Sequence, residues 1–212
     1  MTILRICFVG DSITAGTGDD QYLGWPGRLC ATERAKGHDV TLYNLGIRSD
    51  TSPLIAARWR AECEARLPPP YPAALMFAFG INDTAEELAG SLRVRPADTI
   101  RIARQILGEA KAWLPTLMIG PVAVDESKMP LRIGLVRRDW RNQRVQQTAR
   151  DLAAVASEVG VPYLDLYSLI GNDPAFSRAL AAGDGVHPSS EGYAILATAI
   201  GSWMAWRAWF DG

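Results

Sequence analysis

The sequence predicts an α/β fold in which helices cover both faces of a parallel sheet. Short apolar runs alternate along the chain with longer amphipathic stretches. The apolar runs are nearly continuous, which is typical of strands that are buried on both faces. Strands that alternate with helices form parallel sheets, because a parallel connection needs a long crossover. We therefore expect a flavodoxin-like three-layer α/β/α sandwich with a five-stranded parallel sheet.

The expected elements follow one another in regular order. Strands are predicted for the apolar runs at 4–9, 40–44, 73–79, 116–120 and 161–166. Helices are predicted for the amphipathic stretches at 25–36, 51–67, 96–113, 137–159 and from 189 to about 209. The proline-rich residues 68–72 form a stiff connection into the third strand rather than a domain linker.

Length and composition indicate one ordinary globular domain over residues 1–212, with 48% hydrophobic and 21% charged residues. The net charge of -1 removes any general electrostatic case for nucleic acid or an anionic membrane as partner. No apolar run approaches the ~18–20 residues that span a membrane. No secretory signal is visible, and Cys7, Cys30 and Cys63 fit buried free thiols. We therefore expect a cytoplasmic protein.

Three polar clusters, each after an apolar segment, indicate one site built from distant parts of the chain. Ser12 follows the first apolar run, and Asn82 and Asp83 follow the third. His187 lies near the other end, with Asp184 three residues before it. Ligands of open α/β sheets bind beyond the carboxyl ends of the strands, where these clusters are expected to meet.

The residue types in these clusters predict a serine nucleophile with its base. A serine hydroxyl is a poor nucleophile until a neighbouring base takes its proton. His38 falls in a turn at the amino end of the second expected strand, so His187 is the predicted base. Asp184 can orient the ring through Nδ1 and leave Nε2 for Ser12. The structural alternative is a capped turn at Asp184 that precedes a helix.

An oxyanion at this site needs hydrogen-bond donors fixed in advance. The main-chain N–H of Ser12 and the side-chain amide of Asn82 are the first candidates; a plain Asx turn is the alternative for Asn82. Asp83 is expected to brace its loop, and Asp11 to cap or brace the nucleophile turn. No group of residues has metal-ligand spacing, so neither a metal nor another cofactor is expected.

These clusters also resemble three blocks of the SGNH (GDSL) hydrolase family of esterases and lipases. The blocks are Gly10-Asp11-Ser12-Ile-Thr-Ala-Gly16, Gly80-Ile-Asn82-Asp83 and Asp184-Gly-Val-His187-Pro188, and they lie in the family's order. The resemblance implies hydrolysis of a carboxylic ester through an acyl-enzyme on Ser12. The alternatives are carbohydrate O-acetylesterase activity, which this family also performs, and a non-catalytic flavodoxin-like binding module.

The chain departs from the family pattern at a further oxyanion donor. The family has a glycine directly before Asp-Thr, whereas this chain has Ser49 before Asp50 and Thr51. Because the donor is a main-chain N–H, Ser49 can supply it if its backbone tolerates a side chain. The hydroxyl itself is then expected to be incidental. Gly46, three residues earlier, is the alternative donor.

Two further features each allow two interpretations. Residues 128–144 carry six basic side chains that could clamp an anionic substrate or form a solvated helix face. Trp203, Trp206 and Trp209 recur on the last expected helix, where they could pack in the core or join two copies into a homo-oligomer. We expect the substrate to be a small, accessible ester, since the chain is too short for a large lid.

Overall fold

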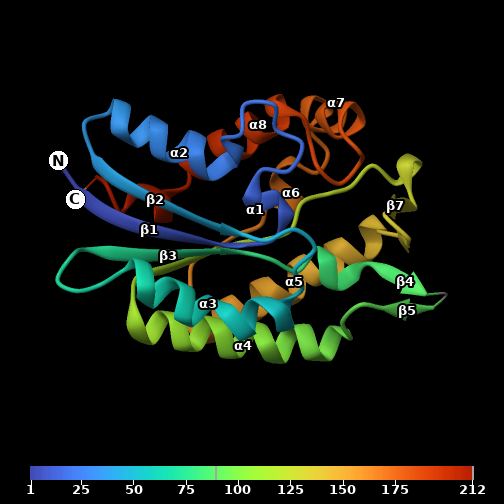
Figure 1. The fold of residues 1–212 in the computed structure, drawn as a ribbon, viewed down its shortest axis with the longest axis horizontal. Coiled ribbons are helices and arrows are strands. Elements are labelled where there is room, and N and C mark those ends of the chain that lie inside the picture. Colours follow the sequence, from blue (N-terminus) through green and yellow to red (C-terminus); the bar gives the residue numbers. More distant parts are fainter. Residues whose placement is uncertain (89, 212) are drawn as a thin grey trace.

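The computed structural model describes residues 1–88 and 90–211 and has the three layers that the sequence predicts (Figure 1). Its central sheet is five-stranded and parallel throughout. In spatial order the strands are β2 (Asp39–Gly46), β1 (Ile3–Gly10), β3 (Ala73–Ala78), β6 (Thr116–Ile119) and β9 (Tyr163–Leu164). The predicted fold class is therefore confirmed, and each strand lies within about three residues of its expected bounds.

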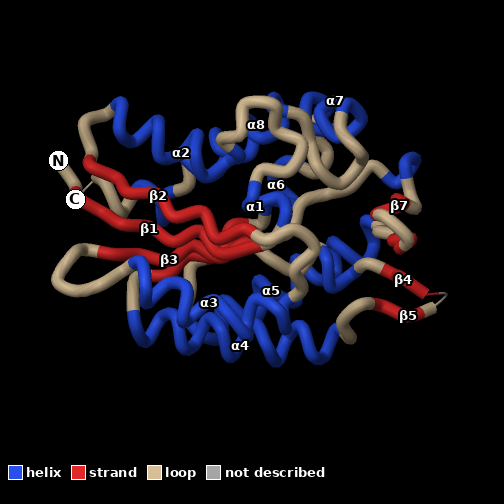
Figure 2. The backbone as a smooth tube through the Cα atoms, in the orientation of Figure 1, coloured by secondary structure: helices blue, strands red, loops and turns tan. Residues whose placement is uncertain are grey.

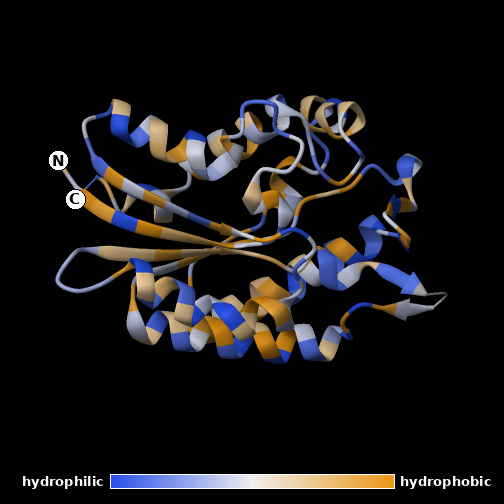
Figure 3. Ribbon diagram, in the orientation of Figure 1, coloured by the Kyte–Doolittle hydropathy of each residue, from blue (hydrophilic) through white to orange (hydrophobic). Residues whose placement is uncertain are grey.

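Helices cover both faces of this sheet (Figure 2). One face carries α2 (Gly24–Ala35) and α8 (Ser190–Gly201), and the other carries α3 (Ser52–Arg66), α4 (Pro96–Trp113) and α5 (Asn142–Val159). Alternate residues of β1 enter separate apolar cores, with Phe8 on the α2 side and Val9 on the α3 side. The strands are accordingly hydrophobic along much of their length (Figure 3). Burial on both faces explains why the apolar runs do not alternate with polar residues.

Smaller elements gather at the carboxyl edge of the sheet. They comprise α1 (Ser12–Ala15), α6 (Leu166–Ile170), α7 (Pro174–Ala182), two 3-10 turns (Asn82–Thr84 and Glu126–Lys128), and two hairpins, β4 (Glu86–Leu88) with β5 (Ser91–Leu92) and β7 (Leu131–Ile133) with β8 (Val136–Arg138). Figure 1 shows both hairpins at the end of the molecule opposite the two termini.

The expected helix at 137–159 starts too early. The structure begins α5 at Asn142, and Arg137 and Arg138 belong instead to strand β8. β8 pairs with β7, and Asp139 exchanges two main-chain hydrogen bonds with Glu86. The hairpin with β7 and the bridge from Asp139 to Glu86 together override local helix propensity here.

The last expected helix, 189 to about 209, is broken. Helix α8 ends at Gly201, Trp203 is extended, and a short α9 (Met204–Arg207) follows. Trp206 and Phe210 are buried in the core, and Trp203 and Trp209 pack partly buried against it. The core interpretation of these tryptophans is thus borne out, while a homo-oligomer through this segment stays a prediction.

The cysteines, the hydrophobicity of the helices and the placement of possible metal ligands were also addressed by the sequence. Cys7, Cys30 and Cys63 are buried free thiols, as predicted. Over the described ranges no helix is both long and apolar enough to cross a membrane. The same residues contain no group of three or more His, Cys, Asp or Glu side chains placed to hold a metal ion.

Candidate active site

The predicted nucleophile lies at a sharp turn between β1 and α1. The strand ends at Gly10, and the Asp11 carboxylate caps α1 by accepting a hydrogen bond from the Ile13 N–H at 3.0 Å. Ser12 is the first residue of α1 and is 4% exposed. A Cβ on Gly10 would lie 2.3 Å from the Ala78 carbonyl oxygen, so only glycine lets the turn sit this close to β3. The turn is thereby fixed at the carboxyl edge of the sheet.

Ser12, His187 and Asp184 form a continuous hydrogen-bonded chain. His187 Nε2 lies 2.8 Å from Ser12 Oγ, and Nδ1 lies 2.6 Å from Asp184 Oδ2. The other oxygen of Asp184 accepts the main-chain N–H groups of Val186 and His187, at 2.9 and 2.8 Å. Asp184 therefore caps its turn and holds the imidazole at the same time, so the two interpretations of this residue are compatible.

The charge of Asp184 fits this arrangement. Partial burial works against the carboxylate, but the hydrogen bond and charge of His187 and the two main-chain donors lower the pKa of Asp184 to about 2. An ionised Asp184 favours the tautomer with the proton on Nδ1. Nε2 is then free to accept the proton of the Ser12 hydroxyl, which is the geometry that general-base activation of a serine requires.

Buried carboxyl groups brace the loops around Ser12. Burial raises the pKa of Asp83, whose carboxyl accepts hydrogen bonds from the Ser52 N–H at 2.8 Å, the Ser52 hydroxyl at 2.5 Å and the Thr99 hydroxyl at 2.8 Å. These contacts tie the loop after β3 to the first turns of α3 and α4, the bracing role expected from the sequence. Burial also raises the pKa of Asp11, to about 7.

Asn82 is tied to the loop that carries Ser49 through the carbonyl of Asp50. Asn82 is buried, and its Nδ2 donates a hydrogen bond to the Asp50 carbonyl at 3.0 Å. This bond sets the orientation of the amide and leaves its second N–H for another acceptor. Ser49 has a φ of 70°, in the left-handed region. Among the described residues its main-chain N–H has no acceptor.

The alternative donor, Gly46, serves a different purpose. Its N–H donates to the Asn44 side-chain oxygen at 3.0 Å. A Cβ on Gly46 would lie 2.2 Å from the Ala15 nitrogen, so this glycine is needed for β2 to pack against α1. These contacts favour Ser49 over Gly46 as the oxyanion donor. A serine in this conformation costs about 1–2 kcal/mol relative to glycine.

The basic segment 128–144 fits neither expected interpretation as a whole. Arg138 Nη1 donates to the Ser49 hydroxyl at 2.8 Å, a contact that sequence reasoning missed, so this hydroxyl has a structural partner and is not incidental as expected. Lys128 donates to the carbonyls of Ala181 and of Gly183, the latter at 2.6 Å, and so supports the turn that carries Asp184. The only available signal for these roles was that the segment follows a strand of the sheet.

The remaining histidine lies apart from this site. His38 is at the amino end of β2, where its Nδ1 accepts the Thr2 N–H at 3.2 Å and its ring packs 5.1 Å from that of Phe210. It is half-buried rather than fully on the surface, but it lies at the end of the sheet that the sequence indicates.

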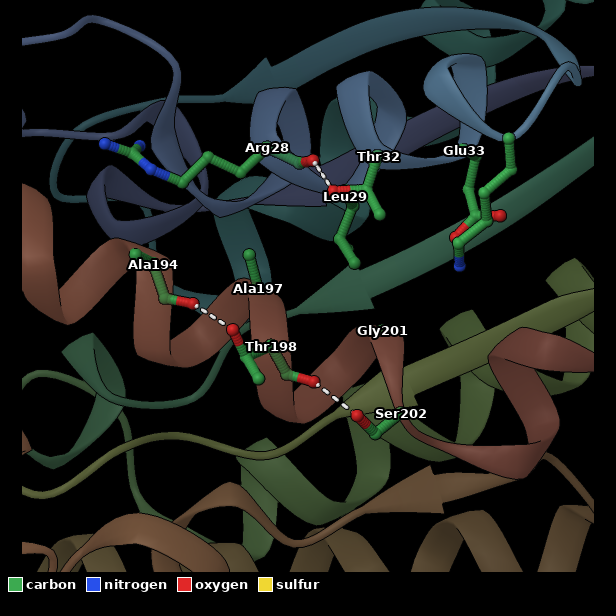
Figure 4. A pocket seen from close by; sticks show the side chains of 10 residues that line it. Arg28, Leu29, Thr32, Glu33, Ala194, Ala197, Thr198, Gly201 and Ser202 are labelled. Carbon is green, nitrogen blue, oxygen red and sulfur yellow. Dashed lines mark hydrogen bonds and ion pairs between the residues drawn. The ribbon is translucent and has the colours of Figure 1, made fainter.

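One hollow lies beside the end of α1, and another lies between two helices on the same face of the sheet. One, of about 380 Å³, is open and lined by residues 15–20, Tyr22 and Arg48. One of its lining residues, Gly18, packs close to His187, since a Cβ on Gly18 would lie 3.5 Å from the His187 Cβ. The other, of about 370 Å³, lies between α2 and α8 and is lined by Arg28, Glu33 and Thr198 among others (Figure 4). None of the candidate site residues lines either hollow.

Several solved structures share the fold of this chain. A lipase/acylhydrolase from Enterococcus faecalis is 23% identical with a TM-score of 0.75, over 98% of this chain and 97% of that one. An acetylxylan esterase from Geobacillus stearothermophilus is 20% identical with a TM-score of 0.71, over 95% of each chain. A protein named TesA is 23% identical with a TM-score of 0.71, over 97% and 99%. At these identities the likeness establishes the fold alone.

Sequence comparison identifies the family directly. No curated protein matches the sequence. The model of the GDSL-like lipase/acylhydrolase family, however, matches residues 8–195, which include Ser12, Asn82, Asp184 and His187. This match covers most of the chain and agrees with the resemblance carried by the three sequence blocks. The chain therefore belongs to the GDSL-like lipase/acylhydrolase family of hydrolases.

Proposed function

We propose that this protein is a serine esterase that hydrolyses small carboxylic esters through an acyl-enzyme on Ser12. The observation that carries the proposal is the hydrogen-bonded chain from Asp184 through His187 to Ser12 Oγ, with distances of 2.6 and 2.8 Å. A non-catalytic binding module has no need for an aligned nucleophile, base and carboxylate at the ligand-binding edge of its sheet.

In the first half of the reaction, Ser12 Oγ attacks the ester carbonyl carbon while His187 Nε2 takes the hydroxyl proton. The carbonyl oxygen becomes an oxyanion, which accepts hydrogen bonds from the main-chain N–H groups of Ser12 and Ser49 and from the Asn82 amide. The intermediate then collapses, and the bond to the alcohol oxygen breaks. His187 returns its proton to that oxygen, and the acyl group stays on Ser12.

In the second half, water attacks the acyl-enzyme while His187 accepts one of its protons. The same three donors stabilise the second oxyanion. Collapse releases the carboxylic acid, and Ser12 Oγ recovers its proton from His187. Throughout the cycle Asp184 stays ionised, consistent with its lowered pKa, and stabilises the imidazolium that forms twice.

Accessible, small substrates are favoured by the surroundings of the site. The hollow near His187 is open, and the end of α1 and the loop that follows it form one of its walls. Trp25 is buried in the core, whereas Tyr22 is 93% exposed and lines the hollow.

The proposal is tested with p-nitrophenyl acetate and a fluorophosphonate probe. We expect the wild-type protein to hydrolyse the ester and the probe to label Ser12 and abolish activity. Ser12→Ala should lose activity by at least about 10³-fold, since removing the nucleophile leaves only binding and oxyanion stabilisation. Ser202→Ala, at the end of α8, is the matched control and should behave as wild type. Labelling of a different serine with loss of activity would contradict the proposal.

Deacetylation of a carbohydrate is the second candidate function. It is favoured by the exposed ring of Tyr22, which offers a flat face beside the open hollow for a sugar to stack on, and by the structural likeness to an acetylxylan esterase. For this candidate, Tyr22→Ala should lower kcat/KM for acetylated sugars by about tenfold or more and leave that for p-nitrophenyl acetate unchanged. Equal effects on both substrates, or none, would count against it.

A further inference from the structure

We infer that Arg138 is a positioning residue that holds the oxyanion donor of Ser49 in place. This inference rests on the proposed esterase function and explains how a serine replaces the glycine that the family has at this position. The geometry has three parts: a strained donor residue, a loop anchored on both flanks, and a guanidinium fixed on the hairpin β7–β8.

The first part is the backbone of Ser49. Its φ of 70° is readily adopted by glycine but is disfavoured for serine, because Cβ crowds the neighbouring carbonyl oxygen. The φ torsion also sets the direction of the peptide unit that carries the Ser49 N–H. A serine that relaxed to negative φ would therefore turn the proposed donor away from the oxyanion.

The second part is the anchoring of the loop. Upstream, the Ile47 N–H donates to the Gly10 carbonyl at 3.1 Å. Downstream, the Asp50 carbonyl accepts from Asn82, and the Asp50 carboxylate pairs with Arg58 at 2.7 Å. With both flanks held, relaxation of Ser49 has to turn its own Cα, and this movement carries the hydroxyl away from its partner.

That partner is the guanidinium of Arg138. Nη1 donates to the Ser49 hydroxyl at 2.8 Å, while Nε donates to Glu87 at 2.8 Å. The main chain beside Arg138 is held as well, since Asp139 and Glu86 exchange hydrogen bonds of 2.9 and 3.0 Å. Arg138 is largely buried, with 11% of its side chain exposed. A charged donor fixed in this way makes a stronger hydrogen bond than a neutral one, and the left-handed serine is stabilised by it.

A double-mutant cycle compares the effect of Arg138→Met on kcat in the wild-type background and in the Ser49→Gly background. Methionine keeps part of the aliphatic stem of arginine and removes the donors. In the wild-type background Arg138→Met should lower kcat on p-nitrophenyl acetate by about 10–100-fold, as misplacement of one catalytic group does, with KM changed less than about twofold. Glycine needs no hydrogen bond to stay left-handed, so in the Ser49→Gly background the same change should lower kcat by less than about threefold.

A neighbouring arginine provides the control for the loss of positive charge on this strand. Arg137→Ala removes the exposed neighbouring arginine on the same strand and should leave kcat unchanged. An equal loss from Arg138→Met in both backgrounds would overturn the inference, since Arg138 would then act on the substrate or on the hairpin. So would full activity of Arg138→Met in the wild-type background, or an inactive Ser49→Gly variant.

Thermal unfolding separates this inference from the proposed function. Loss of the hydrogen bond should lower Tm more in the serine background than in the glycine background, by about 2–4 °C. If the wild-type protein hydrolyses no ester, the proposed function fails while the unfolding cycle still tests the contact. Equal Tm shifts in both backgrounds would overturn the inference regardless of activity.

Discussion

At the scale of single residues, the Asn82 amide holds a loop, and we propose that it also stabilises the oxyanion. One of its two N–H groups donates to the Asp50 carbonyl, and the other is the proposed oxyanion donor. We expect Asn82→Ala to lower kcat by about 10²–10³-fold, as loss of a side-chain oxyanion donor does. The measurement is steady-state hydrolysis of p-nitrophenyl acetate, with Tm recorded alongside. A loss of less than threefold in a folded variant would remove Asn82 from the mechanism.

Asp11 makes stability depend on pH. Its folded-state pKa, raised by burial to about 7, lies above the ordinary value of 3.8. The protonated form is therefore favoured in the folded state, and the stability that it contributes is present below about pH 4 and lost as the pH rises to 7. Asp11→Asn keeps a good N-cap and removes the charge.

This variant should be more stable than wild type above pH 7, by about 2–4 kcal/mol, and close to wild type near pH 4. Urea unfolding of both proteins at pH 4.5 and pH 8 checks the sign. A difference that is the same at both pH values would mean that Asp11 does not titrate between them.

At the scale of elements, the nucleophile turn depends on close packing between α1 and β2. Gly46→Ala would place a Cβ 2.2 Å from the Ala15 nitrogen and 2.8 Å from the Asp11 carbonyl oxygen, so α1 has to shift. We expect about 1–3 kcal/mol of destabilisation and at least a tenfold fall in kcat, because the shift moves Ser12 relative to His187. Gly108→Ala is the control: nothing lies within 4 Å of the added methyl, and alanine suits the interior of α4. Wild-type kcat for Gly46→Ala would contradict this account.

The main elements and the positions of Ser12, Asn82, Asp184 and His187 were predictable because both rest on local patterns. Apolar runs mark the buried strands, and polar residues that end those runs meet at one edge of a parallel sheet. The hairpins were not predictable in this way. β8 pairs with β7, and the adjoining Asp139 pairs with Glu86, more than fifty residues earlier, whereas the sequence of β8 alone suggests the start of α5.

The contact between Arg138 and Ser49 could not be predicted from the sequence for a related reason. Its contact with Ser49 joins residues 89 positions apart, and it depends on a φ value that the sequence does not state. The departure from the family glycine pointed to Ser49 as unusual. Which side chain compensates for the serine could be learned only from the fold.

At the scale of the whole molecule, the candidate site lies at one edge of the sheet and a buried ion-pair cluster lies at the other. The candidate site lies at the carboxyl edge with its loops and hairpins, whereas both termini lie at the opposite end (Figure 1). There the fully buried carboxylate of Glu33 on α2 pairs with Arg207 at 2.5 Å and Lys36 at 3.2 Å, and it accepts a hydrogen bond from the Trp206 indole. This cluster fastens the C-terminal segment to α2.

Because the Glu33 carboxylate has no exposure, removing one partner leaves a buried charge incompletely neutralised. Arg207→Met should therefore destabilise the protein by about 2–4 kcal/mol and lower Tm by roughly 5–15 °C. Its kcat at 25 °C should stay within twofold of wild type, since Ser12 and His187 lie at the other edge of the sheet.

Two further variants distinguish the contribution of the buried Glu33–Arg207 pair from that of an exposed ion pair. Asp211→Asn removes the exposed partner of Arg207 and should lower stability by less than about 1 kcal/mol. Glu33→Gln combined with Arg207→Met should recover part of the lost stability, because no unpaired charge is then buried. Differential scanning calorimetry and p-nitrophenyl acetate assays on the same preparations measure both quantities. A variant at Arg207 that loses activity in proportion to stability would mean that the two edges of the sheet are coupled, and that the C-terminal segment helps to set the geometry around Ser12.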